Sequence, residues 1–236
     1  MTTTRLALLA STAPLLAAQL AYAEPSQELI DAAKAEGMLT TIALPHNWCG
    51  YGEVIAAFKA KYGIEVNELN PNAGSADELE AVKANKGNTG PQAPDVLDVG
   101  LSFGPQAKAE GLIQPYKVST WESIPAEAKD AEGYWYGDYY GVLGFAVNSD
   151  VFAQAPKSFA DLMASDYANS VALQGDPRTG NSTMMTVYAA GLAKGAKGGA
   201  EALDAGIGYF KGLKEAGTLV PVNGNAQNLA QGTTPI

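Results

Sequence analysis

Hydrophobic and polar residues alternate along the first part of the chain in blocks that predict helices and strands in turn. Apolar residues recur at helical spacing over residues 27–36, and Gly37 ends that pattern. Residues 39–44 are β-branched or apolar and predict a strand. Residues 53–62 repeat the helical spacing, and residues 64–66 have the composition of a strand again.

A polar motif marks the start of the next predicted helix. In Ser75-Ala76-Asp77-Glu78 we expect a capping box, in which the serine accepts from the third backbone N–H and the glutamate reaches back. Residues 95–99 then predict a short buried strand, and residues 105–110 predict one or two helical turns. The repeated order of strand, helix and strand predicts the α/β class, with a mostly parallel sheet covered by helices on both faces.

The pattern changes where aromatic residues concentrate. Residues 134–140 contain five aromatics, and residues 141–148 predict a strand that crosses between two lobes. A second α/β unit is expected beyond it, with a strand over 171–173 and helices over 158–164, 182–193 and 200–216. The buried stripe of the last helix is expected to comprise Leu203, Ile207, Phe210 and Leu213.

The first 23 residues have the pattern of a cleavable export signal. Arg5 precedes an interrupted apolar stretch, and Ala21-Tyr22-Ala23 supplies small residues at the two positions that a signal peptidase reads. The alternative is a membrane anchor, which needs about 20 apolar residues, more than this stretch provides. We therefore expect residues 1–23 to be a signal peptide and the rest of the chain to be secreted.

Composition and charge disfavour several classes of function. The 236 residues carry a formal net charge of −10, which argues against binding to nucleic acid. Cys49 is the one cysteine, so we expect a free thiol and no disulfide within the chain. His46 is the one histidine, which disfavours a His-rich metal site or a Ser-His-Asp triad. These counts disfavour enzymes and metal sites of those kinds, and we therefore name no catalytic residue, no cofactor, no metal ligand and no nucleic-acid partner.

Several short segments, taken in their order along the chain, resemble one known family. They are residues 58–66, 93–96, 109–116, 144–148, 156–162 and 175–182. The most specific are GFAVN at 144–148 and PKSFADL at 156–162. In this order they resemble the extracellular solute-binding proteins of bacterial ABC importers, in the branch that includes ferric-iron, polyamine, thiamine and aminoethylphosphonate binders.

The resemblance implies a two-lobe, type II-like periplasmic binding protein fold, with a hinge that closes on a solute. It implies an N-terminal α/β lobe over residues 24–143, and a hinge with an incomplete second α/β lobe over residues 144–236. The family's return to the first lobe is missing before Ile236, so we expect the C-terminal part to be truncated. The implied partners are a small-molecule solute and an ABC permease in the inner membrane, and the complete protein is expected to be a monomer. Ferric-binding members take adjacent tyrosines from the missing region, so iron stays an open alternative.

Two loops that follow predicted strands carry candidate solute-binding residues, because open α/β sheets bind ligands beyond the carboxyl ends of their strands. Asn47 and Trp48 lie in the first loop, where Trp48 and Tyr51 wall a pocket or only pack against the loop itself. His46 is expected to be a hydrogen-bonding residue of this loop and not a ligand. Asp98 lies in the second loop, where it faces the solute or caps the following turn, and we favour the cap.

The aromatic segment over residues 134–140 supplies a second set of candidates. Trp135 and Tyr139, beside Asp138, suit a cationic amine, because ring faces and a carboxylate both attract positive charge. The alternative is that these aromatics pack as a cover over the hinge.

The loop before the helix expected at 182–193 supplies a third set. Arg178, Thr179, Asn181 and Ser182 place donor groups at a helix N-terminus, which suits a phosphonate or a carboxylate. The alternative is an ordinary helix cap by Asn181 or Ser182. A solute that carries both charges would satisfy this set and the aromatic set together.

Three functions fit these features. The favoured one is a periplasmic substrate-binding component of an ABC transporter, which captures a small polar, charged solute of the polyamine, aminophosphonate or iron class and delivers it to a permease without chemistry. A secreted hydrolase would use paired carboxylates, although no motif identifies two of them. A ligand-sensing adaptor would signal through a membrane receptor instead of delivering the solute.

Overall fold

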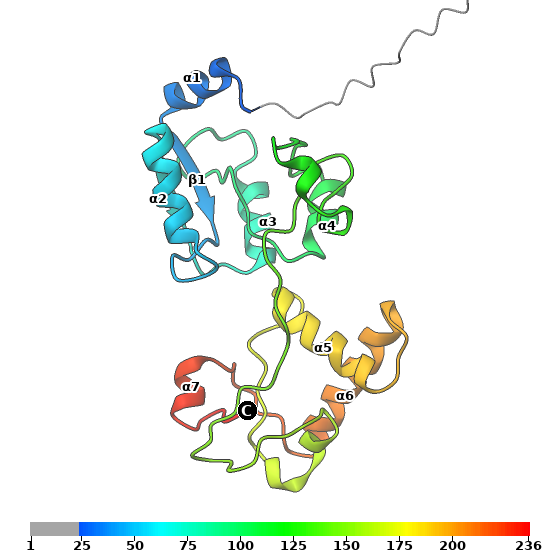
Figure 1. The fold of residues 1–236 in the computed structure, drawn as a ribbon. Coiled ribbons are helices and arrows are strands. Elements are labelled where there is room, and N and C mark those ends of the chain that lie inside the picture. Colours follow the sequence, from blue (N-terminus) through cyan, green and yellow to red (C-terminus); the bar gives the residue numbers. More distant parts are fainter. Residues whose placement is uncertain (1–23) are drawn as a thin grey trace, which may run out of the picture.

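A computed structural model describes residues 24–236, so the expected signal peptide lies outside the described residues. The helices and strands form two groups, one above the other in Figure 1 and joined by extended chain. The N-terminal group holds α1 (Gln27–Glu36), β1 (Met38–Ile42), α2 (Tyr51–Tyr62), β2 (Glu65–Leu69), α3 (Ser75–Ala84) and α4 (Phe103–Ala109). The C-terminal group holds α5 (Asn181–Ala193), α6 (Gly199–Glu215) and α7 (Ala226–Ala230). Short 3-10 turns lie at Trp121–Ser123, Ala126–Ala128, Asp161–Met163 and Ser165–Tyr167.

The sheet of the N-terminal group is parallel, as expected, but narrow. β1 and β2 pair in register from Met38 opposite Glu65 to Ile42 opposite Leu69. On the other side of β1, Val96 forms a single parallel bridge with Thr41. The expected strand over 95–99 is therefore reduced to one bridge.

The C-terminal group is built around the packing of α5 against α6. Its core contains Leu162, Val171, Tyr209 and Leu213, all at most 6% exposed. Val171 forms one parallel bridge with Leu219, so the strand expected over 171–173 is also a single bridge.

Two further elements expected in this half of the chain are absent from the described residues. Residues 141–148 have no regular secondary structure, and the helix expected over 158–164 is only the 3-10 turn at Asp161–Met163. The physical reason for the first is that a strand needs a paired neighbour, and Val142 is 93% exposed instead. The lobe boundary expected at residues 143 and 144 stays a prediction.

The buried face of α6 differs from the stripe that apolar spacing predicts. Ala202, Gly206, Tyr209 and Leu213 are buried, whereas Ile207 is 46% exposed. The reason is that α6 lies very close to α5 and presents its smallest residues to it. A Cβ added at Gly206 would lie 1.9 Å from the backbone oxygen of Val187.

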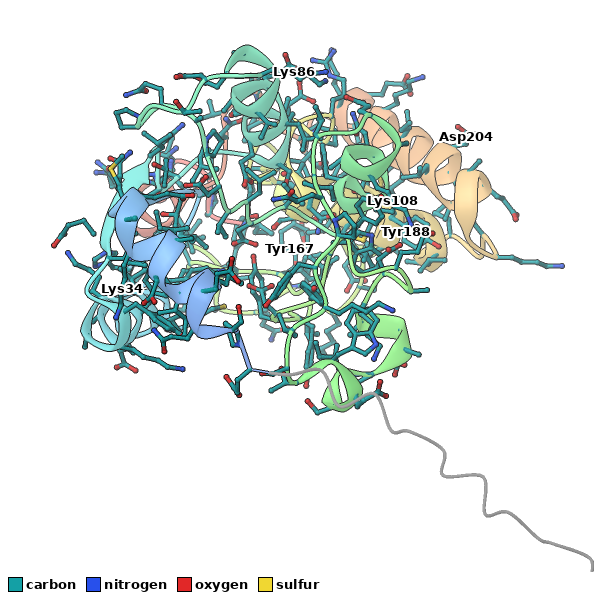
Figure 2. All side chains as sticks on the ribbon, turned by 90° about the horizontal axis from the view of Figure 1, so that it is seen from above. Lys34, Lys86, Lys108, Tyr167, Tyr188 and Asp204 are labelled. Carbon is teal, nitrogen blue, oxygen red and sulfur yellow. The ribbon has the colours of Figure 1, made fainter. Side chains whose placement is uncertain are left out.

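Figure 2 shows Lys86 and Asp204 at the edge of the molecule. Among the described residues, no helix combines the length and the apolar character that crossing a membrane requires.

Candidate functional site

Three segments that lie far apart in the sequence meet in one cluster of aromatic and acidic side chains. We call Trp48, Tyr51, Asp98, Asp138 and Tyr139 the aromatic–acid cluster. The hydroxyl of Tyr51 donates to Oδ2 of Asp138 at 2.5 Å, and the hydroxyl of Tyr139 donates to Oδ2 of Asp98 at 3.3 Å. The Tyr139 ring lies edge-on to both neighbours, with ring centroids 6.0 Å from Trp48 and 6.5 Å from Tyr51.

The loop between β1 and α2 positions the first part of this cluster. Gly50 has a φ of 79°, a left-handed conformation that favours glycine, and it allows the chain to turn directly into α2 at Tyr51. Nε2 of His46 lies 2.6 Å from Oε2 of Glu68 on β2, which ties the loop to the sheet. Cys49 is a free and exposed thiol in the same loop.

The electrostatics of the cluster favour a positive ligand. Burial raises the pKa of Asp98, and the charge of Asp138 raises it further. Burial also raises the pKa values of Tyr51 and Tyr139, so both hydroxyls remain protonated donors. Within residues 24–236, the ion pairs join other carboxylates, and neither Asp98 nor Asp138 belongs to one. A cation placed between these two carboxylates would relieve their repulsion.

The structure therefore brings together some of the predicted residues and separates others. Trp48, Asp98, Asp138 and Tyr139 meet, and Asn47 is exposed in the loop beside them. In place of the turn cap that we favoured, the Asp98 carboxylate accepts from the hydroxyl of Tyr139, a residue 41 positions away in the sequence that the tertiary structure brings within hydrogen-bonding distance. Trp135 instead packs on α4, where a Cβ added at Gly104 would lie 3.1 Å from its ring.

At the start of α5, Arg178 and Thr179 bond within their own loop, and the helix cap lies elsewhere than expected. Arg178 pairs with its neighbour Asp176, with Nε 3.0 Å from each carboxylate oxygen, and this lowers the pKa of Asp176 to about 2. Thr179 donates its hydroxyl to the backbone oxygen of Asp176 at 3.2 Å. The N-cap is Gly180, so the cap expected at Asn181 or Ser182 is wrong; both lie one position or more inside the helix.

The start of α5 is also where the two groups of elements touch. The backbone N–H of Ala76 donates to the oxygen of Thr179 at 3.4 Å, and Oγ of Ser102 lies 3.5 Å from Oδ1 of Asn181. A Cβ added at Gly100 would lie 2.1 Å from Cβ of Asn181, so these two residues are in direct contact. Gly100 is two residues from Asp98, so α5 begins beside the loop that carries a cluster carboxylate.

Sequence reasoning missed the residues that hold this loop. The capping box expected at Ser75 and Glu78 is wrong: the N-cap is Gly74, whose N–H donates to Asp77 at 3.3 Å. Ser75 and Glu78 instead accept from the backbone N–H groups of Gly100 and Asp98, at 3.0 and 2.8 Å. The sequence did single out the serine and the glutamate at the start of α3. It indicated that they bond to their own helix, whereas they bond to the loop over residues 98–100.

Other features of the described residues suit a charged solute less well. A cavity of about 350 Å³ in the C-terminal group is lined by apolar residues such as Phe145, Phe159 and Phe210, and no charged side chain lines it. No group of three or more His, Cys, Asp or Glu side chains within residues 24–236 is arranged to hold a metal ion.

Comparisons with known proteins agree with one another. The family profile described as bacterial extracellular solute-binding protein matches residues 92–236. The "Probable ABC transporter periplasmic-binding protein y4fP" of Sinorhizobium fredii (strain NBRC 101917 / NGR234) is 32% identical over 152 residues, which are 63% of this chain and 41% of that protein. The solved structure of the periplasmic binding protein P5PA superposes with a TM-score of 0.65 at 25% identity, covering 84% of this chain and 62% of that chain.

The chain thus spans 41% of the Sinorhizobium relative and 62% of P5PA. The mixed helix and strand architecture matches that of a periplasmic binding protein. Because the family profile covers more than half of the chain, the protein belongs to the family of bacterial extracellular solute-binding proteins.

Proposed function

We propose that this protein is the periplasmic solute-binding component of an ABC transporter, and that it captures a small polar solute carrying a protonated amine. It delivers this solute to a permease in the inner membrane, and it breaks no bond in the solute. The export pattern of residues 1–23 and the periplasmic relatives support this location.

The observation that carries the choice of solute is the aromatic–acid cluster. Two carboxylates, Asp98 and Asp138, lie within reach of one set of aromatic rings and belong to no ion pair among residues 24–236. The residues Trp48 and Tyr139 are 49% and 44% exposed, which leaves part of each surface available to a solute. An ammonium group gains from both features, because a cation on an aromatic face contributes roughly 0.5–2 kcal/mol in addition to its bond with a carboxylate.

The start of α5 suits the other end of such a solute. α5 has 13 residues and no side-chain cap, so its first backbone N–H groups and the positive end of its dipole can receive an anionic group. Arg178 contributes less than the sequence suggested, since Asp176 already occupies its guanidinium. An amine that also carries a phosphonate or carboxylate would contact both groups of elements and favour their closure.

The test is calorimetric titration of the protein with putrescine, spermidine, 2-aminoethylphosphonate, ferric citrate and glucose. We expect binding of at least one amine, and a weakening of about tenfold or more in Asp138→Asn. A hydrogen bond to a charged group contributes roughly 1.5–3 kcal/mol, and 1.4 kcal/mol corresponds to tenfold in affinity.

The matched control is Asp150→Asn, which removes the same charge from an exposed position in a different part of the chain. This variant should bind like the wild type. Binding of glucose alone, or equal amine affinity in both variants, would contradict the proposed solute class.

A further inference from the structure

The first turn of α3 holds the loop that carries Asp98. Oγ of Ser75 accepts from the backbone N–H of Gly100 at 3.0 Å, and Oε2 of Glu78 accepts from the backbone N–H of Asp98 at 2.8 Å. Ser75 is 7% exposed and Glu78 is 0% exposed. We call this pair the α3 clamp.

The loop over residues 98–100, which the α3 clamp holds, makes two different contacts. At Asp98 it presents a carboxylate to Tyr139 in the aromatic–acid cluster. At Gly100 it receives the first residue of α5, Asn181, from the other group of elements. A shift of this backbone would therefore move a solute-binding group and an inter-group contact at the same time.

Burying the carboxyl group of Glu78 costs free energy of folding. Its Oε1 has no hydrogen-bond partner among the described residues, and burial raises its pKa to about 8. An apolar side chain at this place would avoid the cost of burying a carboxyl group. What the carboxyl supplies, and a leucine would not, is an acceptor for the N–H of Asp98.

We infer that Ser75 and Glu78 are positioning residues of the solute site, which hold residues 98–100 so that Asp98 faces the cluster and Gly100 faces α5. The role of Asp98 toward an amine rests on the proposed function. The hold on the loop itself can be measured without any solute.

The first experiment measures hydrogen exchange at the amides of Asp98 and Gly100 by NMR, in the solute-free chain. Glu78→Leu should speed exchange at Asp98 by about tenfold or more, because a local hydrogen bond is lost. Ser75→Ala should do the same at Gly100. Glu78→Gln keeps an acceptor oxygen and cannot ionise, so it should retain the wild-type protection.

The second experiment measures the dissociation constant for spermidine in the same variants. We expect about tenfold weaker binding in Glu78→Leu and Ser75→Ala, and rescue to within about threefold in Glu78→Gln. A general loss of structure would not be rescued in this way. If Glu78→Leu does not fold, Ser75→Ala tests the same hold from the Gly100 side.

The outcomes separate the two proposals. Unchanged exchange at Asp98 in Glu78→Leu and at Gly100 in Ser75→Ala would overturn the clamp. Faster exchange with an unchanged spermidine constant would overturn its role in the site. If the wild type binds none of putrescine, spermidine and 2-aminoethylphosphonate while the expected exchange pattern is seen, the amine proposal is contradicted and the hold on the loop stays supported.

Discussion

Replacing Gly206 with alanine tests how α5 and α6 are joined. A Cβ at this position would lie 1.9 Å from the backbone oxygen of Val187 and 2.8 Å from its carbonyl carbon. Non-bonded carbon atoms need about 3.5–4.0 Å, so one helix must move by more than about 1 Å. The obstacle is backbone in the middle of a helix, which no side-chain rotation can relieve.

The expected cost follows from two opposing terms. Forcing an extra methyl group into a packed core costs typically about 1–3 kcal/mol. Alanine gains about 1 kcal/mol over glycine in a helix interior. Because a clash this short requires a whole helix to shift, we place the packing cost at its upper end, and expect a net loss of about 2 kcal/mol in the free energy of unfolding.

Gly208 provides the matched control, because it lies on the same helix with no neighbouring atom within 4 Å of an added Cβ. Gly208→Ala should keep only the helix gain and stabilise the protein by about 0.5–1 kcal/mol. Urea denaturation followed by far-UV circular dichroism measures both variants. The reasoning is refuted if Gly206→Ala is as stable as Gly208→Ala.

Three further predictions follow from the loop over residues 98–100 and its surroundings. Gly100→Ala should push Asn181 and its helix away, and small-angle X-ray scattering should show a larger radius of gyration. An unchanged radius of gyration, or a radius that Asn181→Gly does not restore in the double variant, would argue against this contact. The pKa of Glu78 is raised to about 8, so the contribution of Glu78 to the free energy of unfolding is full at low pH. This contribution declines as pH rises from about 4.5 to 8, by at most about 1.4 kcal/mol per pH unit. Urea titrations at several pH values should show this decline in the wild type and a flatter dependence in Glu78→Gln. The raised pKa of Asp98 should make amine affinity fall with decreasing pH from above the ordinary aspartate value of about 3.9, and calorimetry of Asp98→Asn should find this pH dependence reduced.

Helices were predicted well from sequence because their signals are local. The helix expected over 27–36 is α1 with the same bounds, and the helix expected over 182–193 begins one residue earlier in the structure. Gly37 and Gly63 end their helices with φ values of 78° and 69°, as the position of a glycine after an apolar repeat indicates. Apolar spacing and the glycines that end helices depend on neighbours within a few residues, so a sequence pattern contains them. The N-caps expected at Ser75 and at Asn181 or Ser182 were wrong, because Ser75 bonds to a distant loop and each helix begins after a glycine.

Strands and buried faces were predicted less well because they depend on distant partners. Residues 95–99 and 171–173 have strand composition, but each makes a single bridge, since pairing requires a neighbour from elsewhere in the chain. Ile207 has helical spacing with other apolar residues of α6, yet it is 46% exposed, because close contact with α5 buries Gly206 instead.

The candidate site shows the same division. The sequence alone identified Trp48, Asp98, Asp138 and Tyr139 as residues whose chemistry suits a charged solute. Only the tertiary structure decided that they meet, that Trp135 packs elsewhere, and that the serine and glutamate of α3 hold the loop over residues 98–100 and not their own helix. The physical reason is that residue type determines what a side chain can bind, whereas the packing of segments far apart in the chain determines which partner lies within hydrogen-bonding distance.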